Sequence, residues 1–106
     1  MRRFASLRRQ ADFSRLRQRG RRIATPSLML YRSDAAAADD RPLVGISVSK
    51  AVGKAVVRNR LRRRLAAILQ ETLDGRTRMR LLIVPRPHAA ATPFDALAAE
   101  LGRALG

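Results

Sequence analysis

The stretch GISVSKAVGKAVVRNRLRRRL, residues 45–65, decides how this chain folds. It begins inside a β-branched run, 41–50, in which apolar and polar residues alternate as they do in a strand. Gly53 then interrupts the chain, and the apolar residues after it recur at helical spacing instead of at every second position. The stretch therefore predicts a strand over 41–50, a turn at the glycine and a long helix over about 54–73.

The predicted long helix is amphipathic. On a wheel of about 100° per residue, its apolar side chains share an arc of about 120°: Val57, Leu61, Leu65, Ile68, Leu69 and Thr72. The arginines lie around this arc: Arg58 and Arg62 border one edge, Arg60 and Arg64 border the other, and Arg63 lies away from the core beside Asn59. The apolar arc therefore anchors the helix, and its outer surface presents guanidinium groups.

The chain before this helix carries weaker signals. Residues 1–10 are basic and lack apolar periodicity, so we expect a flexible or loosely docked arm. Residues 11–19 have helical spacing and end before a glycine, which predicts a short helix. The apolar run 27–32 predicts a strand, which we expect to form a hairpin with 41–50 across the polar loop 33–40.

The chain after the long helix predicts one more strand and one more helix. Residues 80–85 form a continuous apolar run that ends in a proline, as is typical of a strand buried on both faces. Apolar side chains then recur at helical spacing over about 93–105. With 106 residues and no internal repeat, the pattern predicts a single α+β domain over 1–106, in which helices pack on a small sheet.

The composition excludes several classes of site. The chain has no cysteine, which rules out disulfides and thiolate metal sites and favours a reducing, cytoplasmic location. It has no apolar stretch long enough for a signal peptide or a membrane span. His88 has no partner at ligand spacing, and Asp34, Asp39 and Asp40 fit solvated loop residues better than metal ligands. No nucleophile–base pair or carboxylate dyad is visible, so we assign no catalytic residue and no metal ligand.

Net charge is the strongest functional signal. Lysine and arginine number 23 against 8 acidic residues, which gives a net charge of +15. Residues 1–64 hold 18 basic and 4 acidic residues, whereas 65–106 hold 5 and 4. A coding bias toward arginine would not concentrate the excess in one part of the chain, so we attribute the asymmetry to function. Such a protein repels itself at neutral pH, and a polyanionic partner relieves that repulsion.

Nucleic-acid binding explains the basic helix better than two alternatives. A solvated helix face usually mixes charges, because like charges at i, i+4 are destabilising, yet no acidic residue lies between Lys54 and Gln70. A helix lying on a membrane would need a free apolar face, but the small core requires that face. Arginine forks match phosphate geometry, and Phe13 and Tyr31 would stack on bases of a single strand, although a core role fits both equally well.

The residues 45–65 also resemble the signature region of the bacterial ribonuclease P protein subunit. The heart of that signature is Arg58-Asn59-Arg60, preceded by a Ser-Val-Ser-Lys strand end and a Gly-Lys-Ala-Val turn. LRRQADFSRLRQRGRR (7–22) is similar to the first helix of the family, and LMLY (28–31) before a variable loop fits as well. The resemblance covers about residues 7–105.

This resemblance implies a fold and a function. The fold is α+β in the order α-β-β-β-α-β-α, with an extra short strand near 21–25 and a left-handed β-α-β crossover from 42–48 to 80–84. The implied function is assembly, one protein to one RNA, with a large catalytic RNA that removes the 5′ leader of precursor tRNA. The RNA and its Mg²⁺ ions perform the hydrolysis, so the protein alone would bind no cofactor. The free protein would be a monomer.

The resemblance also assigns roles to individual residues. Those that would bind the leader of precursor tRNA, in a cleft between the first helix and the sheet, are Phe13, Arg17, Tyr31, Lys50, Arg58 and Asn59. Those that would bind the catalytic RNA are Arg8, Arg9, Lys54, Arg60, Arg62 and Arg63. The chain departs from the family pattern at Arg17, where many members have a second aromatic residue, and at Ala66, where some have a basic one.

Two other functions share the charge and the fold class. A structural RNA-binding protein of the ribosomal type would bind RNA whether or not a single-stranded leader is present. A non-specific DNA-binding protein would prefer duplex DNA to RNA. Affinities for precursor tRNA, mature tRNA and duplex DNA separate the three.

Overall fold

The computed structural model describes residues 3–34, 41–74 and 78–106. In chain order its strands and helices are β1 (Ala5–Ser6), α1 (Gln10–Arg19), β2 (Arg21–Ala24), β3 (Leu28–Ser33), β4 (Leu43–Ile46), α2 (Ala55–Thr72), β5 (Arg80–Pro85) and α3 (Phe94–Leu105). Two short 3₁₀ turns, η1 (Lys50–Val52) and η2 (Pro87–Ala91), precede α2 and α3. The predicted α+β class and all three predicted helices are confirmed.

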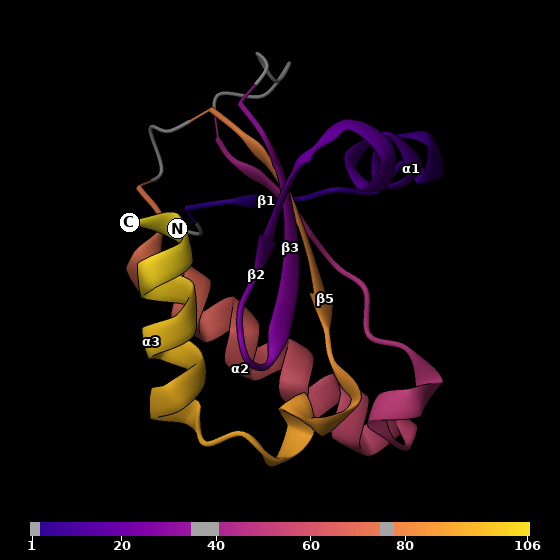
Figure 1. Cartoon of the computed structure of the whole chain (residues 1–106), viewed down its shortest axis with the longest axis vertical. Helices are drawn as coiled ribbons and strands as arrows, with labels where there is room; N and C mark the ends of the chain where they lie inside the picture. Colours follow the sequence, from indigo (N-terminus) through magenta and orange to yellow (C-terminus); the bar gives the residue numbers. More distant parts are fainter. Residues whose placement is uncertain (1–2, 35–40, 75–77) are drawn as a thin grey trace.

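A single mixed sheet separates the helices into two layers (Figure 1). α1 covers one face of the sheet, and α2 and α3 cover the other. Side chains alternate along each strand, so Leu81 and Ile83 of β5 enter the larger core under α2 and α3. Leu82, between them, joins a smaller cluster with Leu7 and Leu16 beneath α1. The two faces of the sheet therefore carry cores of very different size.

β5 lies at the centre of the sheet, in the strand order β1-β4-β5-β3-β2. It runs parallel to β4 and antiparallel to β3, so that Leu82 pairs with Gly45 on one side and Tyr31 on the other. The predicted hairpin between 27–32 and 41–50 is therefore wrong, because β5 lies between these strands. The physical reason is burial: a strand whose core positions are all apolar, 81–85 here, is stable only where both of its faces are covered.

α2 forms the connection between the parallel neighbours β4 and β5. Its buried side chains are four of the predicted apolar set, Leu61, Leu65, Ile68 and Leu69, while Val57 and Thr72 are half-buried. The left-handed sense of this crossover stays a prediction. β2, paired antiparallel with β3, confirms the extra strand expected near 21–25.

The N-terminal segment requires a second correction. Residues 3–9 are docked on the sheet, because β1 pairs in parallel with β4 and the Leu7 N–H donates to the Val44 carbonyl at 2.9 Å. Phe4 is buried in the larger core, and Leu7 is buried in the smaller one. Of the two alternatives predicted for 1–10, a flexible arm is wrong over the described residues 3–10, and a docked segment is what the structure shows. β1 has only two residues, which is too few for a sequence pattern to reveal a strand. The residues that flank it, Phe4 and Leu7, nevertheless pack on opposite faces of the sheet.

A buried carboxylate ties α3 to the turn between β2 and β3. Glu100 is 5% exposed and accepts hydrogen bonds from the Thr25 hydroxyl at 2.6 Å and from the Ser27 backbone N–H and hydroxyl, each at 2.8 Å. Burial by itself raises the pKa of Glu100, but these hydrogen bonds and the nearby Arg103 charge outweigh burial and hold that pKa below its usual value. The carboxylate is therefore stabilised in its charged form by the fold.

Candidate nucleic-acid interface

A cleft opens at the edge of the sheet where β1 ends. β1 pairs only with Leu43 and Val44, so it leaves the edge of β4 at Gly45 and Ile46 uncovered. α1 borders this opening from one face of the sheet, and α2 borders it from the other. The cleft has a volume of about 350 Å³ and is lined by Phe4, Ser6, Leu7, Phe13, Val44, Gly45, Ile46, Arg62, Arg63 and Ala66.

Phe13 forms the α1 wall of this cleft. A Cβ atom at position 45 would lie 2.6 Å from Phe13 Cε1 and 2.9 Å from Cζ, so the ring lies directly on the backbone of Gly45. Only a glycine in the strand permits so close an approach. The ring packs on the small cluster of Leu7, Leu16 and Leu82 and stays half-buried. One side of the ring is therefore packed on the protein, while part of it lines the cleft.

Arg62 and Arg63 form the opposite wall, together with Ala66. Arg62 Nη1 donates a hydrogen bond to Asn59 Oδ1 at 2.9 Å. A guanidinium group can only donate, so the amide oxygen of Asn59 faces Arg62, and its NH₂ group remains a donor toward an incoming ligand. The family resemblance assigned Asn59 to the leader and Arg62 to the catalytic RNA, yet the two side chains are hydrogen-bonded to each other.

The α2 arginines have no acidic partner in the part of the chain that the structure describes. No acidic residue lies between Lys54 and Gln70, and none of Arg58, Arg60, Arg62, Arg63 and Arg64 forms an ion pair with another residue that the structure describes. The wall of the cleft therefore carries uncompensated positive charge beside an aromatic ring, which is the combination that binds single-stranded nucleic acid.

The other predicted residues are not part of the lining of this cleft. Tyr31 lies on the α1 face of β3, half-buried in the same small cluster as Phe13. Arg58 is half-buried near the start of α2, and its Nε is buried without a hydrogen-bond partner. The remaining predicted residues are exposed: Arg8, Arg9, Arg17, Lys50, Lys54, Asn59 and Arg60.

Comparison with known proteins decides among the nucleic-acid binders. The family model described as "Ribonuclease P" matches residues 1–106. The chain belongs to the ribonuclease P protein family. It is 43% identical over 101 residues to the ribonuclease P protein component of Acidothermus cellulolyticus, covering 94% of this chain and 84% of that protein. It is 41% identical over 106 residues to the component of Thermobifida fusca, covering 93% and 72%.

Solved structures of ribonuclease P proteins share the fold. The protein from Staphylococcus aureus superposes with a TM-score of 0.81 at 23% identity, over 94% of this chain and 91% of that one. The protein from Thermotoga maritima gives a TM-score of 0.76 at 20% identity, over 91% and 90%. The five-stranded sheet with three helices is thus the ribonuclease P protein fold.

Several residues of the ribonuclease P cleft were not predicted. Ser6 and Leu7 come from β1 and its end, which sequence patterns did not reveal, and Ile46 lines the cleft because β1 stops short of it. Gly45 did carry a signal, because an isolated glycine inside a strand often marks a close approach of another group. Ala66, noted only as a departure from the family pattern, completes the α2 wall with a small side chain.

No metal centre or membrane span is found in the described part of this ribonuclease P protein. Residues 3–34, 41–74 and 78–106 contain no group of three or more His, Cys, Asp or Glu side chains that could hold a metal ion. The Asp34 carboxylate pairs with Arg32 Nε at 2.8 Å, and Asp39 and Asp40 lie outside the described residues. His88 Nε2 donates to the Pro26 carbonyl at 3.0 Å. Among the same residues no helix is both long and apolar enough to cross a bilayer.

Proposed function

We propose that this chain binds the leader of precursor tRNA and the catalytic RNA of ribonuclease P on adjoining surfaces of the cleft between α1 and α2. Family membership makes the chain the protein subunit of an endoribonuclease that acts in the 5′ maturation of precursor tRNA. One observation carries the finer proposal: the half-buried ring of Phe13 and the guanidinium groups of Arg62 and Arg63 line the same cleft.

The leader is the ligand that fits the α1 side of the cleft. An unpaired base stacks on the open part of the Phe13 ring, while the adjacent phosphates meet Arg62 and the free NH₂ group of Asn59. Tyr31 belongs to the same side-chain cluster as Phe13, and Arg17 lies one helical turn beyond it. These two residues extend the leader path along α1, with Lys50 and Arg58 toward the start of α2.

The catalytic RNA fits the outer surface of α2 and the segment before α1. Arg60 and Arg63 are exposed on α2, Lys54 is exposed at its start, and Arg8 and Arg9 are exposed just before α1. Arginine forks on a rigid helix bind phosphates of a folded RNA without reading its bases. Arg62 would lie between the leader and the catalytic RNA, because it lines the cleft and also donates a hydrogen bond to Asn59.

We assign the hydrolysis to the RNA subunit and the Mg²⁺ ions that it binds. The protein neutralises phosphates with arginine side chains, and this lowers the concentration of Mg²⁺ that the RNA and its substrate require. The proposed assembly contains one protein and one RNA, with a protein that is monomeric alone and acts in the cytoplasm.

The test is cleavage of precursor tRNA by the bare catalytic RNA at low Mg²⁺, with and without this protein. We expect strong stimulation by the protein, which by itself cleaves nothing, and tighter binding of precursor tRNA than of mature tRNA. The variant Arg62→Gln should weaken RNA binding and lower the log–log salt slope by about 0.7–0.9 if it contacts one phosphate. Arg103→Gln, exposed on α3 across the sheet, is the charge-matched control. An absence of stimulation would refute the proposal.

A further inference from the structure

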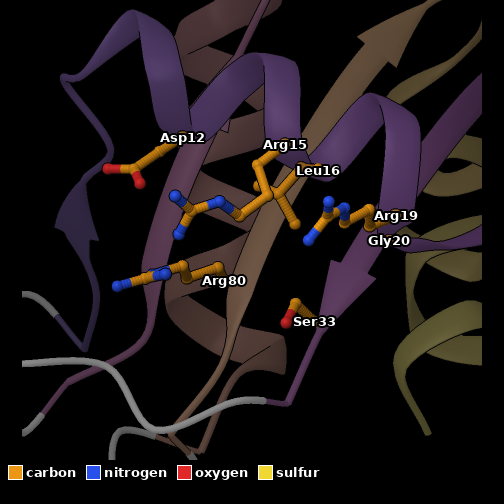
Figure 2. Close-up of a pocket in the computed structure, with 7 residues that line it drawn as sticks. All are labelled: Asp12, Arg15, Leu16, Arg19, Gly20, Ser33 and Arg80. Carbon is orange, nitrogen blue, oxygen red and sulfur yellow. The ribbon is translucent and has the colours of Figure 1, made fainter.

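A second basic cavity lies on the other flank of α1 (Figure 2). It has a volume of about 170 Å³ and is lined by Asp12, Arg15, Leu16, Arg19, Gly20, Ser33 and Arg80. It shares no residue with the cleft. At about 100° per residue, Arg15 and Arg19 lie on one side of the buried Leu16, and Phe13 lies on the other side. α1 therefore separates two distinct basic openings.

Three arginines from two elements meet at this cavity. Arg15 and Arg19 are one turn apart on α1, and Arg80 begins β5, where it pairs in register with Ser33 of β3. Figure 2 shows Arg15 from the helix and Arg80 from the strand extending toward the same side of the opening, with Ser33 below them. Like charges at i, i+4 destabilise a helix. The arrangement therefore has a folding penalty that a bound anion would remove.

No described residue forms an ion pair with these guanidinium groups. Among the residues that the structure describes, none of Arg15, Arg19 and Arg80 has an ion-pair or hydrogen-bond partner for its side chain. Arg80 Nε is itself buried without an acceptor, although it stands at the start of the central strand. Buried donors without an acceptor are disfavoured, and an acceptor from outside the chain, such as a water molecule or an anionic ligand, would satisfy this one. Asp12 is the single acid in the lining.

We propose that this cavity binds one phosphodiester group of an RNA backbone. Guanidinium forks match the geometry of phosphate oxygens, and the Ser33 hydroxyl adds a further polar group. The lining offers no aromatic ring and no side-chain amide to recognise a base, so the ligand is the phosphate rather than a nucleotide. The inference rests on the proposed function for the identity of the partner as RNA. It adds a contact on the far side of α1, so that RNA holds this helix from both flanks.

The decisive variant is Arg15→Gln/Arg19→Gln/Arg80→Gln in the full chain. Its binding to the catalytic RNA and to precursor tRNA is measured separately over a salt series, because either molecule contains the phosphodiester. If all three arginines share one phosphate, the log–log salt slope for one RNA falls by about 0.7–0.9. The RNA whose slope falls is the source of the phosphate. Arg103→Gln, which removes a charge across the sheet, should leave both slopes unchanged.

Two outcomes would overturn this inference. Slopes that match the wild-type chain for both RNAs would show that the cavity binds no phosphate, and a loss about three times larger would show three separate contacts. Arg15→Gln/Arg19→Gln, confined to the exposed surface of α1, gives the same test if Arg80→Gln prevents folding, as thermal unfolding would reveal. If the wild-type chain binds neither RNA, the proposed function fails as well. If it binds both and the triple variant behaves like Arg103→Gln, only this inference fails.

Discussion

The two faces of the sheet perform different tasks. The face under α2 and α3 carries the larger core, to which Leu65, Leu81 and Leu101 contribute fully buried side chains. Among the described residues, the face under α1 buries Leu7, Leu16 and Leu82 in its cluster and leaves Phe13 half-buried. The arginines on its two flanks form no ion pair with a described residue. Stability therefore comes mainly from one face, and the other is left partly open, where we propose that RNA binds. A short chain buries a smaller fraction of its surface than a long one, and here most of that burial lies on one face.

The largest expected effect is on the stable face. Leu65→Ala removes a side chain that is 0% exposed, and we expect it to lower the free energy of unfolding by about 2–5 kcal/mol. Leu16→Ala is the matched control in the smaller cluster beneath α1. It should lower the free energy of unfolding by less than Leu65→Ala does, because the site around Leu16 can relax toward solvent. Urea unfolding of both variants measures the difference. Equal losses would contradict the division between the two faces.

The next effect concerns the carboxylate that joins α3 to the sheet. Glu100→Gln should lower the free energy of unfolding by about 1.5–3 kcal/mol at neutral pH, because hydrogen bonds to a charged group are lost. The pKa of Glu100 is lowered in the folded state, so its contribution is present above the pKa of the unfolded chain. That contribution disappears as the pH falls through the lowered pKa.

Urea unfolding at several pH values checks this expectation. The difference in stability between the wild-type chain and Glu100→Gln should shrink as the solution becomes acidic. Glu71→Gln, at an exposed carboxylate of α2, is the control, and its stability should equal that of the wild-type chain at every pH. A stability difference that is independent of pH would mean that the buried charge is not the source of the effect.

The smallest expected effect on stability, and the sharpest on function, is at the open face. Phe13→Ala should lower the affinity for precursor tRNA relative to mature tRNA by about 1–3 kcal/mol, the contribution of one stacked base. Its cost in stability should stay below the roughly 3–5 kcal/mol of a fully buried phenylalanine. Gly45→Val should have the same effect on binding, because its side chain would displace the ring.

Phe94→Ala controls for the loss of an aromatic ring, since Phe94 is 43% exposed on α3, across the sheet from α1. It should leave the preference for precursor tRNA intact. If Phe13→Ala unfolds the domain, or if Phe94→Ala loses the same preference, the open face is not the leader site.

Local pattern was sufficient for some elements and insufficient for others. The 3.6-residue period of α2 identified its four buried residues, because one long helix presents a single face to the core. β5 was recognised as a buried strand because all its core positions are apolar. The partners of β5 were not predicted, because pairing with β3 and β4 joins residues far apart in the chain. β1 was missed because two residues carry no period.

The candidate site divides in the same way. Phe13, Arg62 and Arg63 were each predicted, and the family resemblance assigned them to two different RNA molecules. Their meeting in one cleft depends on how far β1 covers the edge of β4, which no local pattern records. The cavity beside Arg80 depends likewise on the register of β5 with β3.

The sequence by itself determined that this chain is a basic α+β domain of the ribonuclease P protein family with an anchored arginine helix. Composition, periodicity and a short motif carry that information locally, since each depends on neighbouring residues only. Tertiary structure alone decided that β5 lies between β3 and β4, that β1 stops before Gly45, and that α1 has a basic opening on each flank. Strand pairing and burial act between residues that are distant in the chain, so the sites that they create appear only in the folded molecule.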